Sequence, residues 1–126
     1  GAWRALEELY EEGKIRAIGV SNFYPDRLVD ICAFARIKPM VNQVELHPFH
    51  QQTEAKKWMD KYGVQIEAWA PFGEGRGDMF QNSVLNEIGT KYGKSAGHSP
   101  LAFAEGRGGN PEIHPYREDA GKSECI

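Results

Sequence analysis

Three strand-like segments, each followed by a helix-like segment, recur along residues 17–92 at an interval of about 24 residues. The predicted strands are Ala17–Asn22, Val41–Leu46 and Val64–Trp69. Helical spacing of apolar residues follows each of them, in helices that open at Pro25, Gln51 and Ser83. Strands joined by helices form parallel sheets with right-handed crossovers, so we expect an α/β fold. The apolar first strand is typical of a strand that is buried on both faces.

A helix is also predicted ahead of the first strand, over Trp3–Glu12, with Gly13 as its C-cap. The glycine-rich stretch Gly73–Asp78 is predicted to be a flexible loop. Three βα units and one leading helix do not close a (β/α)8 TIM barrel, which needs about 250 residues. We therefore expect residues 1–95 to be a fragment of such a barrel.

Composition excludes several classes of partner. The chain of 126 residues has a net charge of −3, which disfavours nucleic acid and anionic membranes. No apolar run approaches the ~20 residues of a membrane span, and the first residues do not resemble a signal peptide. With two cysteines, Cys32 and Cys125, a reduced cytoplasmic setting is expected rather than a disulfide framework. The oligomeric state is left open.

Polar and aromatic side chains gather at the ends of the three predicted strands. Ser21 and Asn22 end the first strand, Gln43 lies in the second and Trp69 ends the third. The carboxyl ends of parallel strands are where α/β proteins place their chemistry. Alternation along the second strand puts Gln43 and Glu45 on one face. From the residues alone, Asn22 is more typical of a turn residue or helix cap. The alternatives for the other two are a buried polar residue at Gln43 and a core aromatic at Trp69.

Four motifs in this order resemble the aldo-keto reductases: Gly19-Val-Ser-Asn-Phe23, Asn42-Gln-Val-Glu45, His47-Pro48 and Ala68-Trp-Ala-Pro-Phe-Gly73. The chain looks like the bacterial type that includes 2,5-diketo-gluconate reductases. The resemblance implies a parent oxidoreductase that reduces aldehydes and ketones to alcohols by hydride transfer from NADPH. It also implies a small-molecule carbonyl substrate. The cofactor-binding residues that it implies are Ser21, Asn22, Gln43, Trp69, Ala70, Pro71, Phe72 and Gly73.

Within that set the resemblance assigns roles. Ser21, Asn22 and Gln43 would hold the carboxamide of the nicotinamide ring, and Trp69 would stack on the ring face. Phe72 and Gly73 would begin a loop that passes over the pyrophosphate. The family pattern has Tyr and Ser where this chain has Trp69 and Ala70, so one side-chain hydroxyl is missing at the second position.

The family's catalytic aspartate, tyrosine, lysine and histidine belong to the half of the barrel that would precede Gly1. We therefore expect no catalytic residue and no metal site in this chain, a structural role for His47, and no activity of the chain alone. The alternative is a non-catalytic product, either a truncated gene product or a partner-binding half-barrel module, because one fold hosts many functions.

The last part of the chain, residues 96–126, differs in character. Gly97–Ile126 contains five Gly, three Pro and two His without periodicity, which is typical of a disordered tail. When its codons are read one base further on, they permit the text AQVTLRWLLQRGVVVIPKS, which resembles the final strand of the family with its phosphate-binding Lys-Ser. We expect a one-base frameshift near Ser95 and an unstructured tail; a natural flexible tail is the alternative.

Overall fold

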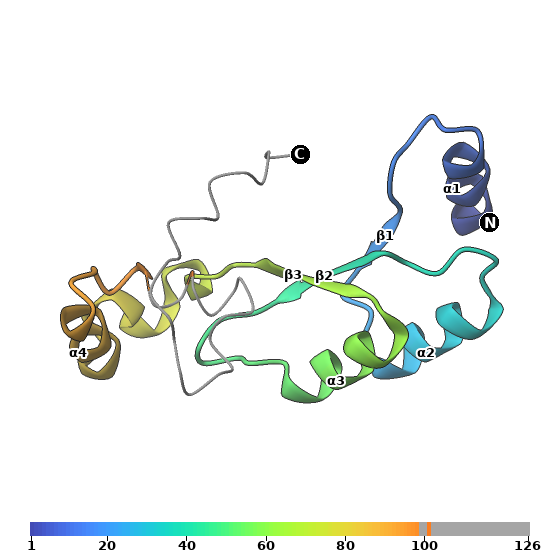
Figure 1. Ribbon diagram of the computed structural model, residues 1–126. Coiled ribbons are helices and arrows are strands. Elements are labelled where there is room, and N and C mark those ends of the chain that lie inside the picture. Colours follow the sequence, from blue (N-terminus) through green and yellow to red (C-terminus); the bar gives the residue numbers. More distant parts are fainter. Residues whose placement is uncertain (99–100, 102–126) are drawn as a thin grey trace.

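The computed structural model describes residues 1–98 and 101 of the chain. Strands and helices alternate along it as the sequence pattern predicts (Figure 1). The elements are α1 (Ala2–Glu11), β1 (Gly19–Ser21), α2 (Pro25–Phe34), β2 (Val41–Glu45), α3 (Thr53–Tyr62), β3 (Gln65–Trp69), the 3-10 helix η1 (Gly73–Gln81) and α4 (Ser83–Lys91). No helix in this described part is long and apolar enough to cross a membrane.

The three strands form one parallel sheet in the order β1-β2-β3. Gly19 pairs with Val41, which in turn pairs with Gln65, and this register continues to the carboxyl ends. The close pairing of β1 with β2 requires Gly19, because a Cβ atom there would lie 2.7 Å from the Val41 carbonyl oxygen. The predicted α/β fragment with a parallel sheet is therefore confirmed.

The core lies between the sheet and the pair α2 and α3, which run side by side along one face of the sheet (Figure 1). Six buried side chains form the central cluster: Leu28, Cys32, Val44, Ala55, Met59 and Val64. Helical spacing explains the contributions of α2 and α3, since residues three and four apart share a helix face. Alternation explains why Val44 of β2 points into this layer and its neighbours do not.

The opposite face of the sheet is open among the described residues. Gly19 and Ser21 of β1 are exposed, as are Gln65 and Glu67 of β3. The expectation that the first strand is buried on both faces is therefore wrong. An apolar run shows that a strand suits a covered environment, but its burial depends on what else packs against it, and here α2 and α3 cover one face alone.

Element boundaries differ from the predicted ones where the backbone turns left-handed. Asn22 has φ 56°, so β1 ends at Ser21. Gln52 has φ 51°, so α3 begins at Thr53 rather than Gln51. The glycine-rich stretch predicted as a flexible loop forms η1 instead. Positive φ occurs at Gly73, Gly75 and two non-glycine residues of this stretch.

Helix α1 attaches to the segment after α2 through two hydrogen bonds. The Ile37 N–H donates to Glu7 at 3.0 Å, and the Trp3 indole N–H donates to the Ile37 carbonyl at 3.1 Å. Glu7 is buried, and Arg36 lies 3.5 Å from its other carboxylate oxygen. The Ile37 N–H, and then Arg36, hold the pKa of Glu7 below its usual range against the opposing effect of burial.

Met59 tests the core, because its side chain is fully buried in the central cluster. We expect Met59→Ala to lower the free energy of unfolding by about 2–4 kcal/mol through lost burial and a residual cavity. Phe34→Ala is the control, since Phe34 is 84% exposed and its loss should cost at most ~0.5 kcal/mol. Urea unfolding followed by circular dichroism measures both; equal effects would contradict this account of the core.

Glu7 predicts how the docking of α1 depends on pH. Its pKa is lower in the folded chain than in the unfolded chain, so its ionised form stabilises the fold above the unfolded value of about 4.3. That contribution disappears as the pH falls through the lower folded value. The stability difference between wild type and Glu7→Gln should therefore shrink on acidification. Glu8→Gln, an exposed neighbour, is the control, and a gap that grows in acid would contradict the prediction.

Candidate functional site

The open face of the sheet carries rows of polar side chains near the strand ends. The register places Ser21 beside Gln43 and Gln43 beside Glu67. One step further along, Glu45 lies beside Trp69. Because side chains two residues apart share a face, these five residues project from the same side of the sheet. The sequence prediction that Gln43 and Glu45 share one face agrees with this arrangement.

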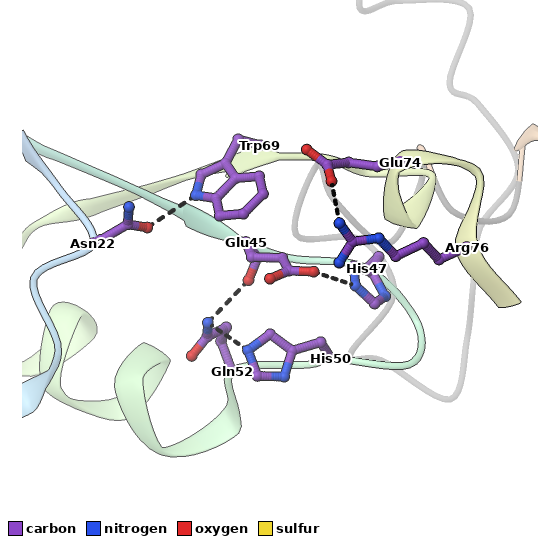
Figure 2. Close-up of polar contacts among 8 residues, drawn as sticks. All are labelled: Asn22, Glu45, His47, His50, Gln52, Trp69, Glu74 and Arg76. Carbon is purple, nitrogen blue, oxygen red and sulfur yellow. Dashed lines mark hydrogen bonds and ion pairs between the residues drawn. The ribbon is translucent and has the colours of Figure 1, made fainter.

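Asn22 and Trp69 are joined directly, although they are 47 positions apart in sequence. The Trp69 indole N–H donates to Asn22 Oδ1 at 2.9 Å, across the carboxyl ends of β1 and β3 (Figure 2). The left-handed backbone of Asn22 turns the chain at this point, a conformation that asparagine adopts more readily than most residues. Two of the predicted cofactor residues therefore lie in contact.

Ser21 and Gln43 are also in contact. The Ser21 hydroxyl donates to the Gln43 carbonyl oxygen at 3.1 Å, and the Asn22 N–H donates to the same oxygen at 2.8 Å. The side-chain amide of Gln43 donates to Glu67 Oε1 of the neighbouring strand. The structure thus brings together Ser21, Asn22, Gln43 and Trp69, and it adds Glu67 to the group.

Asn42 positions this group from the other side of the sheet, and the set of predicted site residues does not include it. Its side chain is fully buried. It donates to the Phe23 carbonyl at 2.7 Å and accepts from the Phe23 N–H at 3.3 Å. These two bonds hold the turn that carries Asn22. The signal available in the sequence is an asparagine at an inward position of an otherwise apolar alternation, which must find partners when buried.

His47 contacts Glu45 rather than any predicted cofactor residue. Its Nε2 lies 3.0 Å from Glu45 Oε1, and the ring is largely buried. Gln52 donates to the Glu45 carbonyl at 3.0 Å and lies 2.9 Å from the ring of the exposed His50 (Figure 2). Backbone hydrogen bonds join His47 and His50 in both directions. These contacts fix the loop after β2, and the structural role of His47 stays a prediction.

The segment from Ala70 to Gly73 leaves β3 through two left-handed residues. Ala70 has φ 49° and Gly73 has φ 61°. Gly73 is buried, and a Cβ there would meet Met79 at 3.4 Å and His47 at 3.9 Å. Pro71 and Phe72 are half-buried between them. Beyond Gly73 the chain enters η1, where Arg76 pairs with Glu74 at 3.2 Å (Figure 2).

Two further observations concern other kinds of site. Within residues 1–98 and 101, no group of three or more His, Cys, Asp or Glu side chains could hold a metal ion. A groove of about 920 Å³ lies between α1 and α2, lined in part by Trp3, Phe23, Ile31 and Phe34. It does not include Ser21, Asn22, Gln43 or Trp69, so it is separate from the group at the strand ends.

The family model for the aldo/keto reductase family matches residues 1–104. The chain belongs to the aldo/keto reductase family. It is 50% identical over 93 residues to glyoxal reductase of Bacillus subtilis, covering 74% of this chain and 33% of that protein. It is 49% identical over 94 residues to 9,11-endoperoxide prostaglandin H2 reductase of Trypanosoma cruzi, again covering 74% and 33%.

Solved structures agree. An aldo-keto reductase from a Medee basin deep-sea metagenome library superimposes with a TM-score of 0.79 at 38% identity, over 83% of this chain and 40% of that one. A silkworm (Bombyx mori) aldo-keto reductase complexed with NADPH gives a TM-score of 0.76 at 29% identity, over 84% of this chain and 35% of that one. The chain spans about a third of the length of its curated relatives, so it is a fragment of this reductase barrel.

Asn42 provides a test of how the site is held. Asn42→Ala removes both partners of the Phe23 backbone groups, so we expect a loss of about 1–3 kcal/mol in the free energy of unfolding. Hydrogen exchange at the Phe23 amide should accelerate as well. Asn86→Ala is the matched control, because Asn86 is exposed and its side chain also makes two hydrogen bonds to the backbone, in this case to the carbonyls of Phe80 and Asn82. If both variants lose the same stability, burial of Asn42 is not what matters.

Proposed function

We propose that this chain forms part of the nicotinamide site of an NADPH-dependent reductase that converts aldehydes or ketones to alcohols. The observation that supports the proposal best is the convergence of Asn22, Gln43 and Trp69 near the carboxyl ends of three neighbouring strands, with Asn22 directly after β1. The NADPH complex of the silkworm relative supports the choice of cofactor. We propose the reduction for the whole enzyme, of which this chain is a piece, and the binding of the nicotinamide ring for this chain itself.

The residues present fit the cofactor chemically. A nicotinamide ring carries a flat apolar face and a primary carboxamide with donor and acceptor groups. The half-buried indole of Trp69 offers a surface for stacking. Asn22 and Gln43 offer amide groups that pair with another amide, and Ser21 adds a hydroxyl beside them. When bound, NADPH supplies the hydride; these residues orient the ring that carries it.

The remaining roles are assigned by the same proposal. Ala70, Pro71, Phe72 and Gly73 form the path toward the pyrophosphate, and the left-handed turns at both ends of that path support a fixed course for it. The acid that protonates the reduced carbonyl oxygen belongs to another part of the barrel, so the chain alone is inactive. We also propose a cytoplasmic location, which the buried free thiol of Cys32 supports.

The proposal includes a one-base frameshift near Ser95. The frameshifted, unstructured tail predicted over residues 96–126 stays a prediction, because the family model matches as far as residue 104. Residues 99–100 and 102–126 lie outside the described residues. A non-catalytic partner-binding module is the competing function, favoured by the open face of the sheet, where Ser21 and Glu67 are exposed. The two functions differ in one measurable property, namely whether the strand-end residues bind NADPH.

Tryptophan fluorescence during NADPH titration tests the proposal. We expect NADPH to quench the emission of the wild type and of Trp58→Phe, because Trp58 lies on α3 away from the strand ends. Most of the quench should disappear in Trp69→Phe, since the proposed stacking partner is then no longer an indole. Circular dichroism verifies that each variant is folded. An equal quench in Trp69→Phe, or none in the wild type, would overturn the proposed function.

A further inference from the structure

We infer that Glu67 and the Trp69 indole N–H are positioning residues that fix which way the side-chain amides of Gln43 and Asn22 point. The inference rests on the proposed function, because it concerns how those two amides recognise a ligand. An asparagine or glutamine amide has one end that donates and one that accepts. A rotation of 180° about the last side-chain bond exchanges these ends, so the neighbours decide the orientation.

At Asn22 the neighbour is the indole of Trp69. An indole N–H can donate a hydrogen bond and cannot accept one, so it selects the oxygen end of the amide. The 2.9 Å contact between Trp69 Nε1 and Asn22 Oδ1 is this pairing. The Nδ2 group then becomes the end of Asn22 that is directed elsewhere, as a donor (Figure 2).

At Gln43 the neighbour is the carboxylate of Glu67, its register partner on β3. A carboxylate accepts hydrogen bonds, so it selects the nitrogen end of the amide. Gln43 Nε2 donates to Glu67 Oε1, which leaves Gln43 Oε1 as the acceptor. The two amides are therefore fixed in opposite orientations. The oxygen of Asn22 faces a donor, the Trp69 indole N–H, and the nitrogen of Gln43 faces an acceptor, the Glu67 carboxylate.

The two fixed amides lie next to each other. The Asn22 N–H donates to the Gln43 carbonyl at 2.8 Å, so Asn22, directly after β1, lies next to Gln43 of β2. Together they offer one donor and one acceptor on the open side of the sheet. A primary carboxamide presents the complementary pair, a C=O acceptor and an N–H donor. A carboxylate presents acceptors at both ends and would face the Gln43 oxygen unfavourably. The geometry therefore favours nicotinamide over nicotinate.

The test compares two variants with two matched controls. Glu67→Gln replaces the acceptor with an amide that can pair with Gln43 in either orientation. Trp69→Phe keeps an aromatic ring and removes the donor. The controls are Glu54→Gln and Trp58→Phe, because Trp58 Nε1 donates to Glu54 Oε1 at 3.0 Å on α3, the same indole and carboxylate chemistry away from the site.

Calorimetric titration of the full chain with three ligands separates recognition of the nicotinamide ring from binding of the rest of the cofactor. The ligands are NADPH, its nicotinic acid analogue, and 2′-phospho-ADP-ribose, which lacks the ring. We expect Glu67→Gln to weaken NADPH binding by about three- to tenfold. The ratio of the affinity for NADPH to the affinity for the acid analogue should also fall. Trp69→Phe should act in the same direction. Binding of 2′-phospho-ADP-ribose should not change in either variant, and neither control should alter any of the three affinities.

Side-chain amide resonances give a readout that is independent of binding. Trp69→Phe should shift the Asn22 NH₂ signals, and Glu67→Gln should shift those of Gln43, while the controls leave both in place. Unmoved signals, or an unchanged preference for the carboxamide in folded variants, would overturn the inference. A wild type that binds none of the three ligands would overturn the proposed function instead, and the amide signals would still decide whether the two orientations are fixed.

Discussion

The parallel pairing of β2 with both of its neighbours is the constraint on which the other features depend. It sets Ser21, Gln43 and Glu67 in one row and Glu45 beside Trp69 in the next. A shift of one residue in either pairing would turn one strand's site residues toward α2 and α3. Gly19 helps to fix this register, because no other residue would allow its backbone to lie so near the Val41 carbonyl.

Much of the fold could be predicted from the sequence because it depends on local chemistry. Helical spacing, the apolar strands and the proline that opens α2 indicate the alternation of elements. The grouping of Ser21, Asn22, Gln43 and Trp69 also followed, since the carboxyl ends of parallel strands meet at one edge. Their position depends on topology, which the order of elements already implies.

The contacts within the group could not be predicted in the same way. The pairing of Asn22 with Trp69 and that of Gln43 with Glu67 depend on which residues stand side by side across strands. Periodicity along one strand carries no information about this. The exposure of Ser21 could not be predicted for a related reason. An apolar run indicates that a strand can be buried, whereas its actual burial also depends on which segments pack against it.

Alternate residues of the five-residue strand β2 face opposite sides of the sheet and have different roles. Asn42 and Val44 point toward the helices, and Gln43 and Glu45 point away from them. Burying Asn42 in the apolar layer is costly unless its amide is bonded, and both of its bonds go to Phe23, directly beside Asn22. The polar group inside the core thus holds the turn that carries a site residue outside it. It follows that the stability of the fold and the position of Asn22 are joined through this turn, whereas Gln43 and Glu67 lie on the open face and do not contribute to the core.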